Sequence, residues 1–258
     1  MNNEKKKTII QRLLSGLVLF PIVAIIVVFG NALIMDITVS LIAMISICEY
    51  YKCFKNNKKA NPSLWYMLIC CLLIMFAHVV SVDALRAILI SFVPISILIL
   101  IGEVILTNGN KKIIDVAVTL LGVCYIPLMM LFLSVIRENF MYGKILIWYV
   151  FISAWGSDIF AYLIGKNFGK HQLTKLSKGK TTEGAIAGVL GAVIIALIYT
   201  AVINSISGIG ISYFLVGIIV IILSIIGQIG DIGASSIKRY CGVKDFSELI
   251  PRTWWNAW

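Results

Sequence analysis

Eight long runs of mostly apolar residues occupy most of this chain and constrain its fold more than any other feature. A helix needs about 20 consecutive apolar residues to cross the hydrocarbon layer of a membrane. The chain is 60% hydrophobic and 13% charged, far from the averages of soluble domains, which excludes a soluble globular protein, a disordered chain, collagen and a coiled coil. We therefore predict an all-α integral membrane protein with about eight transmembrane helices, at 13–29, 31–50, 63–81, 87–106, 114–136, 145–165, 184–204 and 211–230.

The basic residues orient these spans. The chain has 22 Lys and Arg against 12 Asp and Glu, a formal net charge of +10. In the predicted topology every Lys and Arg except Arg86, Arg137 and Lys144 falls on one side of the membrane. Because cytoplasmic loops carry an excess of Lys and Arg, that side is predicted to be cytoplasmic, with both termini on it. The loop topology explains the positive charge, so we expect a multi-pass protein of the cytoplasmic membrane and no nucleic-acid partner.

The loops are short, so we expect residues 1–258 to form a single polytopic membrane domain. Spans 13–136 are nearly featureless and are predicted to be a scaffold, whereas 145–258 carries the polar motifs, with a cytoplasmic loop at 166–183. In the scaffold, the carboxylates near span ends are interpreted as charges solvated by water or head groups. These acids are Asp36, Glu49, Glu103 and Asp115.

The sixth run contains an acid, Asp158, at membrane depth, where a carboxylate normally faces a polar cavity or a partner. The loop that follows, 169–184, combines lysines with glycines and with the hydroxyls of Ser177, Thr181 and Thr182. Ammonium groups, hydroxyls and a flexible glycine backbone suit a polyphosphate ligand. The alternative is a basic loop that sets the topology or touches anionic lipid head groups.

A second polar segment follows the eighth run. Asp231 stands at the end of that run between Gly230 and Gly233, with Ser235 one turn later. Such a carboxylate can hold Mg²⁺, which prefers oxygen ligands, waters and substrate phosphates. The alternative is a helix-end acid whose basic neighbours only mark the membrane interface. Two such segments on one membrane face favour phosphoryl or nucleotidyl transfer, which depends on positioning and charge neutralisation.

Three motifs in this half resemble those of the phosphatidate cytidylyltransferases, the CDP-diacylglycerol synthases. The pattern S-D-x-x-A-Y-x-x-G-x-x-x-G-K falls on Ser157 to Lys170, and S-x-x-K-T-x-E-G falls on Ser177 to Gly184. The C-terminal signature, 230–251, contains S-S-I-K-R at 235–239, K-D-F at 244–246 and L-I-P at 249–251. The resemblance covers about the last 105 residues; the first 150 agree only in hydropathy.

The resemblance implies transfer of a cytidylyl group from CTP to phosphatidic acid with Mg²⁺, a second cation being left open. It implies a metal ligand at Asp231 and an active site that faces the cytoplasm among membrane lipids; a homodimer is left open. The catalytic residues implied are Asp158, Lys238, Arg239, Lys244 and Asp245. The substrate-binding residues implied are Ser157, Tyr162, Lys170, Ser177, Lys180, Thr181, Glu183 and Ser235.

The chain departs from the family pattern at three places. Lys178 replaces a Pro, and Ala234 stands where many members have Glu. After Pro251 the family continues G-H-G-G-x-x-D-R-x-D, whereas this chain reads R-T-W-W-N-A-W. One base inserted before codons for Gly-His-Gly-Gly-Met-Leu reproduces residues 252–257, so we expect a truncated or frameshifted terminus, which resequencing across codon 251 tests.

Three other functions stay open at this point. A polyprenol kinase-like or archaeol-type enzyme would also use CTP on a membrane lipid. A non-catalytic truncated family member would lack turnover. A transporter or channel with Asp158 on its pathway predicts polar residues in several spans, and only the sixth offers one.

Overall fold

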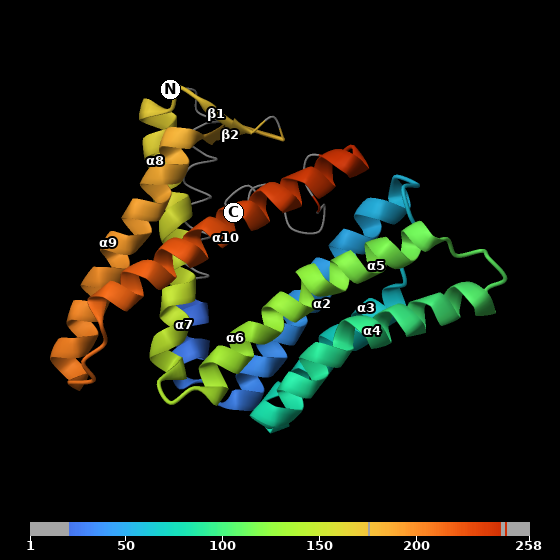
Figure 1. Cartoon of the computed structure of the whole chain (residues 1–258), viewed down its shortest axis with the longest axis horizontal. Helices are drawn as coiled ribbons and strands as arrows, with labels where there is room; N and C mark the ends of the chain where they lie inside the picture. The colour runs from blue at the N-terminus through green and yellow to red at the C-terminus, as the bar shows by residue number, and fades with distance from the viewer. Residues whose placement is uncertain (1–20, 175, 244–245, 247–258) are drawn as a thin grey trace. The chain divides into compact units, whose positions relative to one another are not determined.

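The structure, a computed structural model, describes residues 21–174, 176–243 and 246, and these are mostly helical (Figure 1). The chain divides into two compact units, one of residues 1–144 with 241–258 and one of Ile145–Tyr240. The prediction of an all-α polytopic membrane protein is confirmed. Among the described residues, the helices long and apolar enough to cross a membrane are Ala32–Asn56, Asp83–Leu106, Ile113–Asn139, Gly143–Phe168, Thr182–Ser207 and Tyr213–Cys241.

The number of eight spans stays a prediction. Only residues 21–29 of the first predicted span are described, and they are helical. The third predicted span corresponds to a shorter apolar helix, Leu64–Val79, whose second half is a 3₁₀-helix. Both termini lie outside the described residues, so their side of the membrane is also untested.

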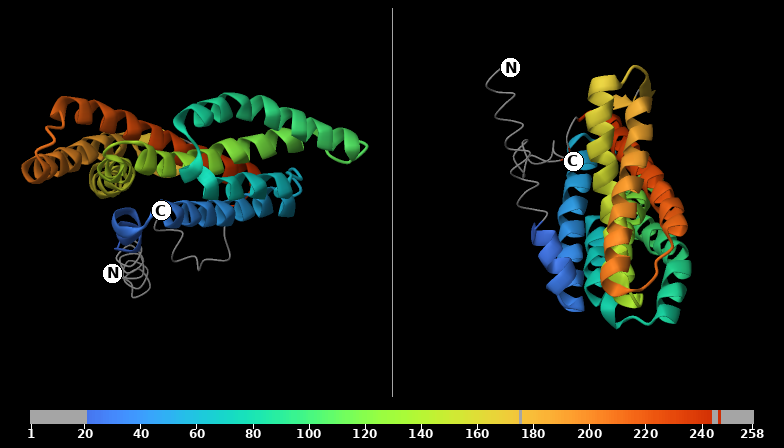
Figure 2. Two further views of the ribbon diagram at one scale, coloured as in Figure 1. Left: turned by 90° about the horizontal axis from the view of Figure 1, so that it is seen from below. Right: turned by 90° about the vertical axis from the view of Figure 1, so that its left-hand side faces the viewer.

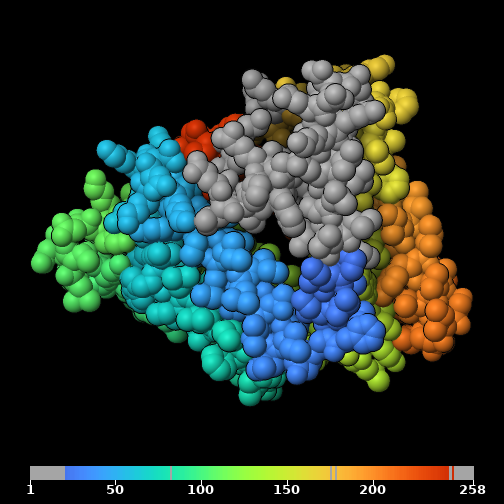
Figure 3. Space-filling model, turned by 180° about the vertical axis from the view of Figure 1, so that it is seen from behind, coloured from blue at the N-terminus to red at the C-terminus, as the bar shows by residue number. Residues whose placement is uncertain are grey.

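The first unit contains the predicted scaffold. Its helix α2 packs against α3, η1 and α6, and α4 packs against α5. Part of the surface of α2 is visible in blue in Figure 3. This helix exposes large apolar side chains, among them Leu41 and Ile45. Such a surface is suited to lipid rather than to water. The elements are α2 (Ala32–Asn56), α3 (Leu64–Leu73), η1 (Ile74–Val79), α4 (Val82–Leu106), α5 (Ile113–Tyr125) and α6 (Pro127–Asn139).

The interpretation of the scaffold acids as solvated charges is wrong for Asp36 and Glu49. Asp36 is 0% exposed, and its Oδ2 accepts hydrogen bonds from the backbone N–H and the Nδ1 of His78, both at 2.8 Å. Glu49 is 2% exposed, and neither of its carboxylate oxygens has a hydrogen-bond partner. Both residues lie on the face of α2 that packs against other helices, and hydropathy alone does not reveal that face.

The other two acids hold loops to helix ends instead of facing solvent. Asp115 accepts hydrogen bonds from the backbone N–H groups of Asn61 at 2.6 Å and Lys112 at 2.8 Å. Glu103 accepts one from Trp65 Nε1 at 3.1 Å and forms an ion pair with Lys111 at 3.7 Å. These carboxylates satisfy backbone or ring donors that would otherwise be unpaired near the ends of apolar helices.

Two of the three basic residues predicted on the non-cytoplasmic side bind the end of helix 21–29. Arg137, in the last turn of α6, is 4% exposed. Its Nε donates to the Val27 carbonyl at 2.9 Å, and its Nη2 donates to the Gly30 carbonyl. Lys144 Nζ donates to the Val28 carbonyl at 3.2 Å. These cations satisfy carbonyls that a helix C-terminus leaves unpaired and complement its negative dipole end.

The second unit consists of two packed helices, a short hairpin and a third long helix. Helices α8 and α9 run side by side, and the hairpin lies at one end of the pair (Figures 1 and 2). The hairpin is antiparallel, with Gln172 opposite Thr181 and Thr174 opposite Ser177. The flexible loop expected at 169–184 is therefore largely an ordered hairpin. The elements are α7 (Gly143–Phe151), the π-helix η2 (Ile152–Gly156), α8 (Ser157–Phe168), β1 (Gln172–Thr174), β2 (Ser177–Thr181), α9 (Thr182–Ser207) and α10 (Tyr213–Cys241).

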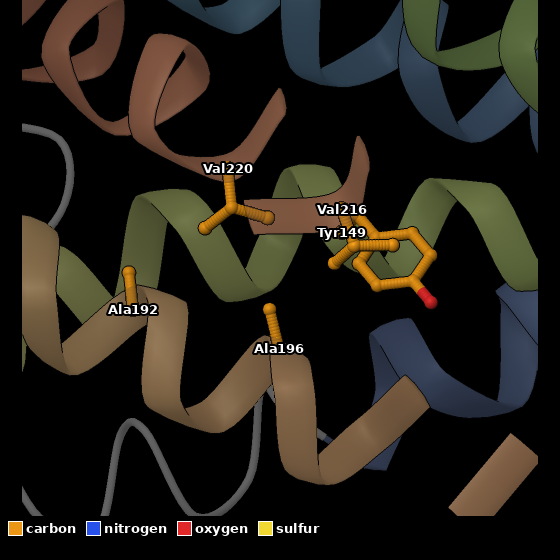
Figure 4. Packing of buried hydrophobic residues seen from close by; sticks show 5 residues of the cluster. All are labelled: Tyr149, Ala192, Ala196, Val216 and Val220. Carbon is orange, nitrogen blue, oxygen red and sulfur yellow. The ribbon is translucent and has the colours of Figure 1, made fainter. Parts of the chain in front are cut away.

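The buried core of this unit joins α7, α9 and α10. Val216 and Val220 of α10 face Ala192 and Ala196 of α9, with the Tyr149 ring of α7 beside them (Figure 4). All five are at most 5% exposed. Small residues on α9 let α10 approach closely, which is how helices in membranes gain van der Waals contact.

Glycines bring α8 and α9 into contact. A Cβ on Gly184 would lie 2.7 Å from the Ala161 carbonyl oxygen and 3.0 Å from Gly165 Cα. A Cβ on Gly188 would lie 2.6 Å from the Ser157 carbonyl oxygen. These contacts are with backbone atoms, which cannot rotate away as a side chain can. Glycine is therefore required along this helix interface.

We expect Gly188→Ala to lower the free energy of unfolding by about 1–3 kcal/mol, because the added methyl group overpacks a tight interface. The matched control is Gly217→Ala on α10, where a Cβ would meet no atom within 4 Å; there alanine removes the helix penalty of glycine. Thermal unfolding of the purified variants in one detergent measures both. Equal unfolding temperatures for the two variants would contradict the interpretation of this interface.

Candidate active site

Three charged side chains from three elements come together in the Ile145–Tyr240 unit. Asp158 lies in the first turn of α8, Lys180 lies on β2, and Asp231 lies on α10. Lys180 Nζ forms an ion pair with Asp231 Oδ2, and Asp158 interacts electrostatically with both Lys180 and Asp231. The side chains of Lys180 and Asp231 are 26% and 44% exposed, so a ligand can reach them. The two predicted polar segments therefore form one site.

Residues at helical spacing along one face of α10 contact the neighbouring helices and so determine where Asp231 points. Val216 and Val220 are in the core, Ser224 Oγ donates to the Ser153 carbonyl at 3.3 Å, and Gln228 Nε2 donates to the Ala185 carbonyl at 3.0 Å. Residues three and four apart share one face of a helix. Asp231 is next on this face, directed to Lys180. It lies within α10, which continues to Cys241, so the alternative of an acid at a helix end is wrong.

The hairpin fixes the backbone of Lys180. Thr181, at the end of β2, is the N-cap of α9, and its Oγ1 accepts a hydrogen bond from the Gly184 N–H at 3.1 Å. Glu183, in the first turn of α9, accepts hydrogen bonds from the Lys170 N–H at 3.2 Å and from His171 Nδ1 at 2.6 Å. A carboxylate at a helix N-terminus is also favoured by the helix dipole. Thr181 and Glu183 thus hold the hairpin on α9, and their predicted substrate contacts stay predictions.

The structure also describes three other residues of the first two motifs. Ser157 is 2% exposed, and its hydroxyl donates to the Ala154 carbonyl at 2.9 Å. Tyr162 is 55% exposed, and the ammonium of Lys166 lies 5.5 Å from its ring centroid. Ser177 is at the opposite end of β2 from Thr181. Ser157 is therefore turned toward its own helix, whereas Tyr162 is accessible.

The residues of the C-terminal signature continue along α10. Ser235 lies one turn beyond Asp231, and Lys238 and Arg239 lie in the last turn of the helix. Lys244 and Asp245 lie outside the described residues, as does the predicted terminus at 252–258, so the structure tests neither prediction.

Three residues of this site carry no role in the sequence interpretation. His171 pairs with Glu183, and Ser224 and Gln228 attach α10 to the neighbouring helices. Ser224 and Gln228 could have been found from their helical spacing with Asp231. No local pattern links His171 to Glu183, because a hairpin that the sequence does not reveal brings them together.

The two carboxylates are suited to a hard cation. Among the described residues, no group of three or more His, Cys, Asp or Glu side chains could hold a metal ion. A cation at Asp158 and Asp231 would therefore take its other ligands from water and from substrate oxygens. Mg²⁺ in nucleotide-dependent enzymes is bound in this way, through one or two carboxylates plus phosphates. The residues present fit such an ion.

These features define a polytopic membrane protein with a candidate site of two carboxylates and a lysine. The model of the cytidylyltransferase family matches residues 10–252, and the chain belongs to this family. The match extends over the scaffold spans as well as the motifs, so the family relation is wider than the motifs alone indicated. The predicted family and the predicted enzyme class, a nucleotidyltransferase, are confirmed.

Bacterial relatives agree with this assignment. The chain is 27% identical over 242 residues to a phosphatidate cytidylyltransferase of Bacillus subtilis, which covers 93% of this chain and 88% of the relative. It is 32% identical over 154 residues to proteins of the same name from Staphylococcus saprophyticus and Staphylococcus aureus. Those alignments cover 59% of this chain and 56% of each staphylococcal protein.

Proposed function

We propose that this protein transfers the cytidylyl group of CTP to phosphatidic acid at the cytoplasmic face of the cell membrane, forming CDP-diacylglycerol and pyrophosphate. The name of the Bacillus subtilis relative supports this substrate pair. The observation that carries the proposal is the convergence of Asp158, Lys180 and Asp231 on one site. Two carboxylates within membrane helices and an ammonium group on the adjoining hairpin suit a triphosphate, a divalent cation and a lipid phosphate. The homodimer stays a prediction from the sequence.

Asp231 and Asp158 would hold Mg²⁺, which when bound supplies positive charge to the phosphate oxygens. The chain's own residues have the remaining tasks. Lys180, on the hairpin, would neutralise oxygens of the triphosphate, and Lys238 and Arg239 would hold the phosphate of the lipid, since Arg and Lys form strong charge-assisted hydrogen bonds with phosphate. Their places on β2 and in the last turn of α10 support this division.

The reaction is a displacement at the α-phosphorus of CTP. An oxygen of the phosphatidic acid phosphate forms a new bond to the α-phosphorus. The bond from the α-phosphorus to the oxygen that bridges it to the β-phosphorus breaks. The electron pair of the broken bond leaves with pyrophosphate. Cationic side chains lower the barrier by neutralising the charge on the transferred and leaving groups.

The experiment that tests this function follows two differently labelled forms of CTP. The purified chain in lipid nanodiscs is given Mg²⁺ and CTP labelled at either the α- or the γ-phosphorus, with phosphatidic acid, a polyprenol or an archaeol-type lipid phosphate. We expect α-label in lipid with phosphatidic acid, release of pyrophosphate, and no γ-label in any lipid. Transfer of γ-label to polyprenol would indicate a kinase, preference for the archaeol-type substrate would indicate that synthase, and no transfer to any lipid would indicate a non-catalytic member.

A further inference from the structure

The ammonium group of Lys180 lies where a divalent cation would bind. Its Nζ contacts Oδ2 of Asp231, one of the two oxygens that the carboxylate offers to a metal ion, and its charge acts on Asp158 as well. The same lysine is assigned to the triphosphate in the proposed function. An ammonium group has three N–H donors, but the Lys180 ammonium lies against the carboxylate oxygen that a cation bound to Asp231 would use. The structure therefore shows Lys180 in an interaction that a cation bound to the same oxygen of Asp231 would replace.

Electrostatics explains this interaction. Asp158 and Asp231 act on each other as like charges, and a neighbouring cation offsets the repulsion between like charges that are brought together. Among the described residues, Lys180 is the ion-pair partner of Asp231. When no divalent cation is present, the lysine thus supplies the balancing charge from within the chain.

We propose that Lys180 is a displaceable internal cation, which occupies the carboxylates of the metal site until a divalent cation and a triphosphate together move it onto the phosphate oxygens. The inference rests on the proposed function and deepens it, because it makes occupation of the metal site and of the nucleotide site interdependent. A divalent cation alone must compete with Lys180 for Asp231. A triphosphate offers the ammonium new partners and so removes the competition.

The structure allows this movement without a change in the backbone. The Lys180 backbone lies between the β1–β2 pairing and the N-cap of α9, and Glu183 attaches the start of the hairpin to the same helix. The lysine side chain has a flexible four-carbon stem and is 26% exposed. Only the ammonium group therefore has to change its partner, and the hairpin keeps it within reach of both.

The test measures the affinity for Mn²⁺, a spectroscopic substitute for Mg²⁺, in the purified full chain without nucleotide. Electron paramagnetic resonance counts free Mn²⁺ in a titration. We expect Lys180→Met to bind Mn²⁺ roughly ten-fold more tightly than the unaltered chain, because a like charge next to the site is removed. Lys180→Arg, which keeps the charge, is expected to bind as the unaltered chain does.

Two further variants make this result specific. Lys166→Met removes the same charge from the end of α8, where the ammonium lies over Tyr162 and not on a carboxylate of the site, and is expected to leave the Mn²⁺ affinity unchanged. In an Asp231→Asn background, Lys180→Met is expected to give a smaller gain, since the contested carboxylate is gone and only the effect of the lysine charge at Asp158 remains. This cycle measures the coupling between the two residues directly.

A second measurement uses the unaltered chain and depends on no variant. A non-reactive CTP analogue is expected to raise the Mn²⁺ affinity, and by thermodynamic reciprocity Mn²⁺ is expected to raise the affinity for the analogue by the same factor. Lys180→Gln, a milder change, is expected to reduce this factor. If Lys180 only holds the hairpin in place, its removal will lower the Mn²⁺ affinity or leave it unchanged, and either result overturns the proposal. Failure of the proposed function is recognised separately, as absent CTP turnover by the unaltered chain.

Discussion

Asp231→Asn is expected to lower the rate of CTP-dependent lipid labelling by about 10³-fold or more, the largest effect that we expect from a single substitution. The exchange keeps the shape of the side chain and removes its charge. Asp231 is the acid in direct contact with Lys180 and the predicted metal ligand, and removing such an electrostatic group at the reacting centre costs two to three orders of magnitude or more in rate. Incorporation of α-labelled CTP into phosphatidic acid measures the loss.

The control for this variant is Asp83→Asn. Asp83 is in the first turn of α4, and its side chain is 94% exposed in an ion pair with Arg86 that is open to solvent. The same chemical change there is expected to leave the rate within about two-fold, because exposed ion pairs contribute little. A near-normal rate for Asp231→Asn, in a protein that unfolds at the usual temperature, would remove Asp231 from the active site.

Arg137→Met is expected to lower the free energy of unfolding by about 3–5 kcal/mol, the largest effect on stability that we expect. Arg137 is 4% exposed, and besides the carbonyls of Val27 and Gly30 its guanidinium pairs with Glu138. Methionine keeps much of the volume but leaves those carbonyls and the carboxylate without their donor. Thermal or denaturant unfolding in detergent, followed by the near-ultraviolet signal of aromatic residues, measures the change.

Arg86→Met provides the comparison for Arg137. Its guanidinium lies 3.7 Å from Asp83, with side chains 74% and 94% exposed, and such surface pairs contribute about 0–1 kcal/mol. Both arginines are predicted on the sparsely charged side of the membrane, and they differ in burial and in their partners. If both variants are equally stable, the contacts of Arg137 with helix 21–29 do not hold that helix.

The length of the apolar runs was sufficient to predict the class of fold, because a membrane span is a run of consecutive apolar residues and can be recognised directly in the sequence. It was not sufficient to identify which side of a helix is buried. Asp36 and Glu49 were interpreted as solvated charges because they lie near span ends, yet both are inside the packing of α2. Burial of this kind depends on which helices become neighbours, and hydropathy contains no information on that pairing.

The candidate site was predicted in its components and not in its geometry. Asp158 and Asp231 were found because carboxylates stand out against apolar runs, and Lys180 was found by resemblance. These three side chains come together because of the hairpin and because the hydrogen bonds of Ser224 and Gln228 orient α10. The hairpin could not be predicted, because its short strands are rich in Lys, Ser and Thr and have no clear strand pattern. Contacts between residues far apart in sequence have no local signature.

The π-helix at Ile152–Gly156 determines in which direction around the helix axis each side chain of α8 points. A π turn contains one residue more than an α turn, so it amounts to a single-residue insertion absorbed within a continuous helix. One residue corresponds to about 100° of rotation in an α-helix. Loss of one residue from 152–156 would therefore turn Asp158 away from Lys180 and turn Gly165 away from α9 at the same time. The helix–helix interface and the active site consequently depend on the same number of residues in the π-helix. A sequence change at 152–156 must preserve that number to keep both.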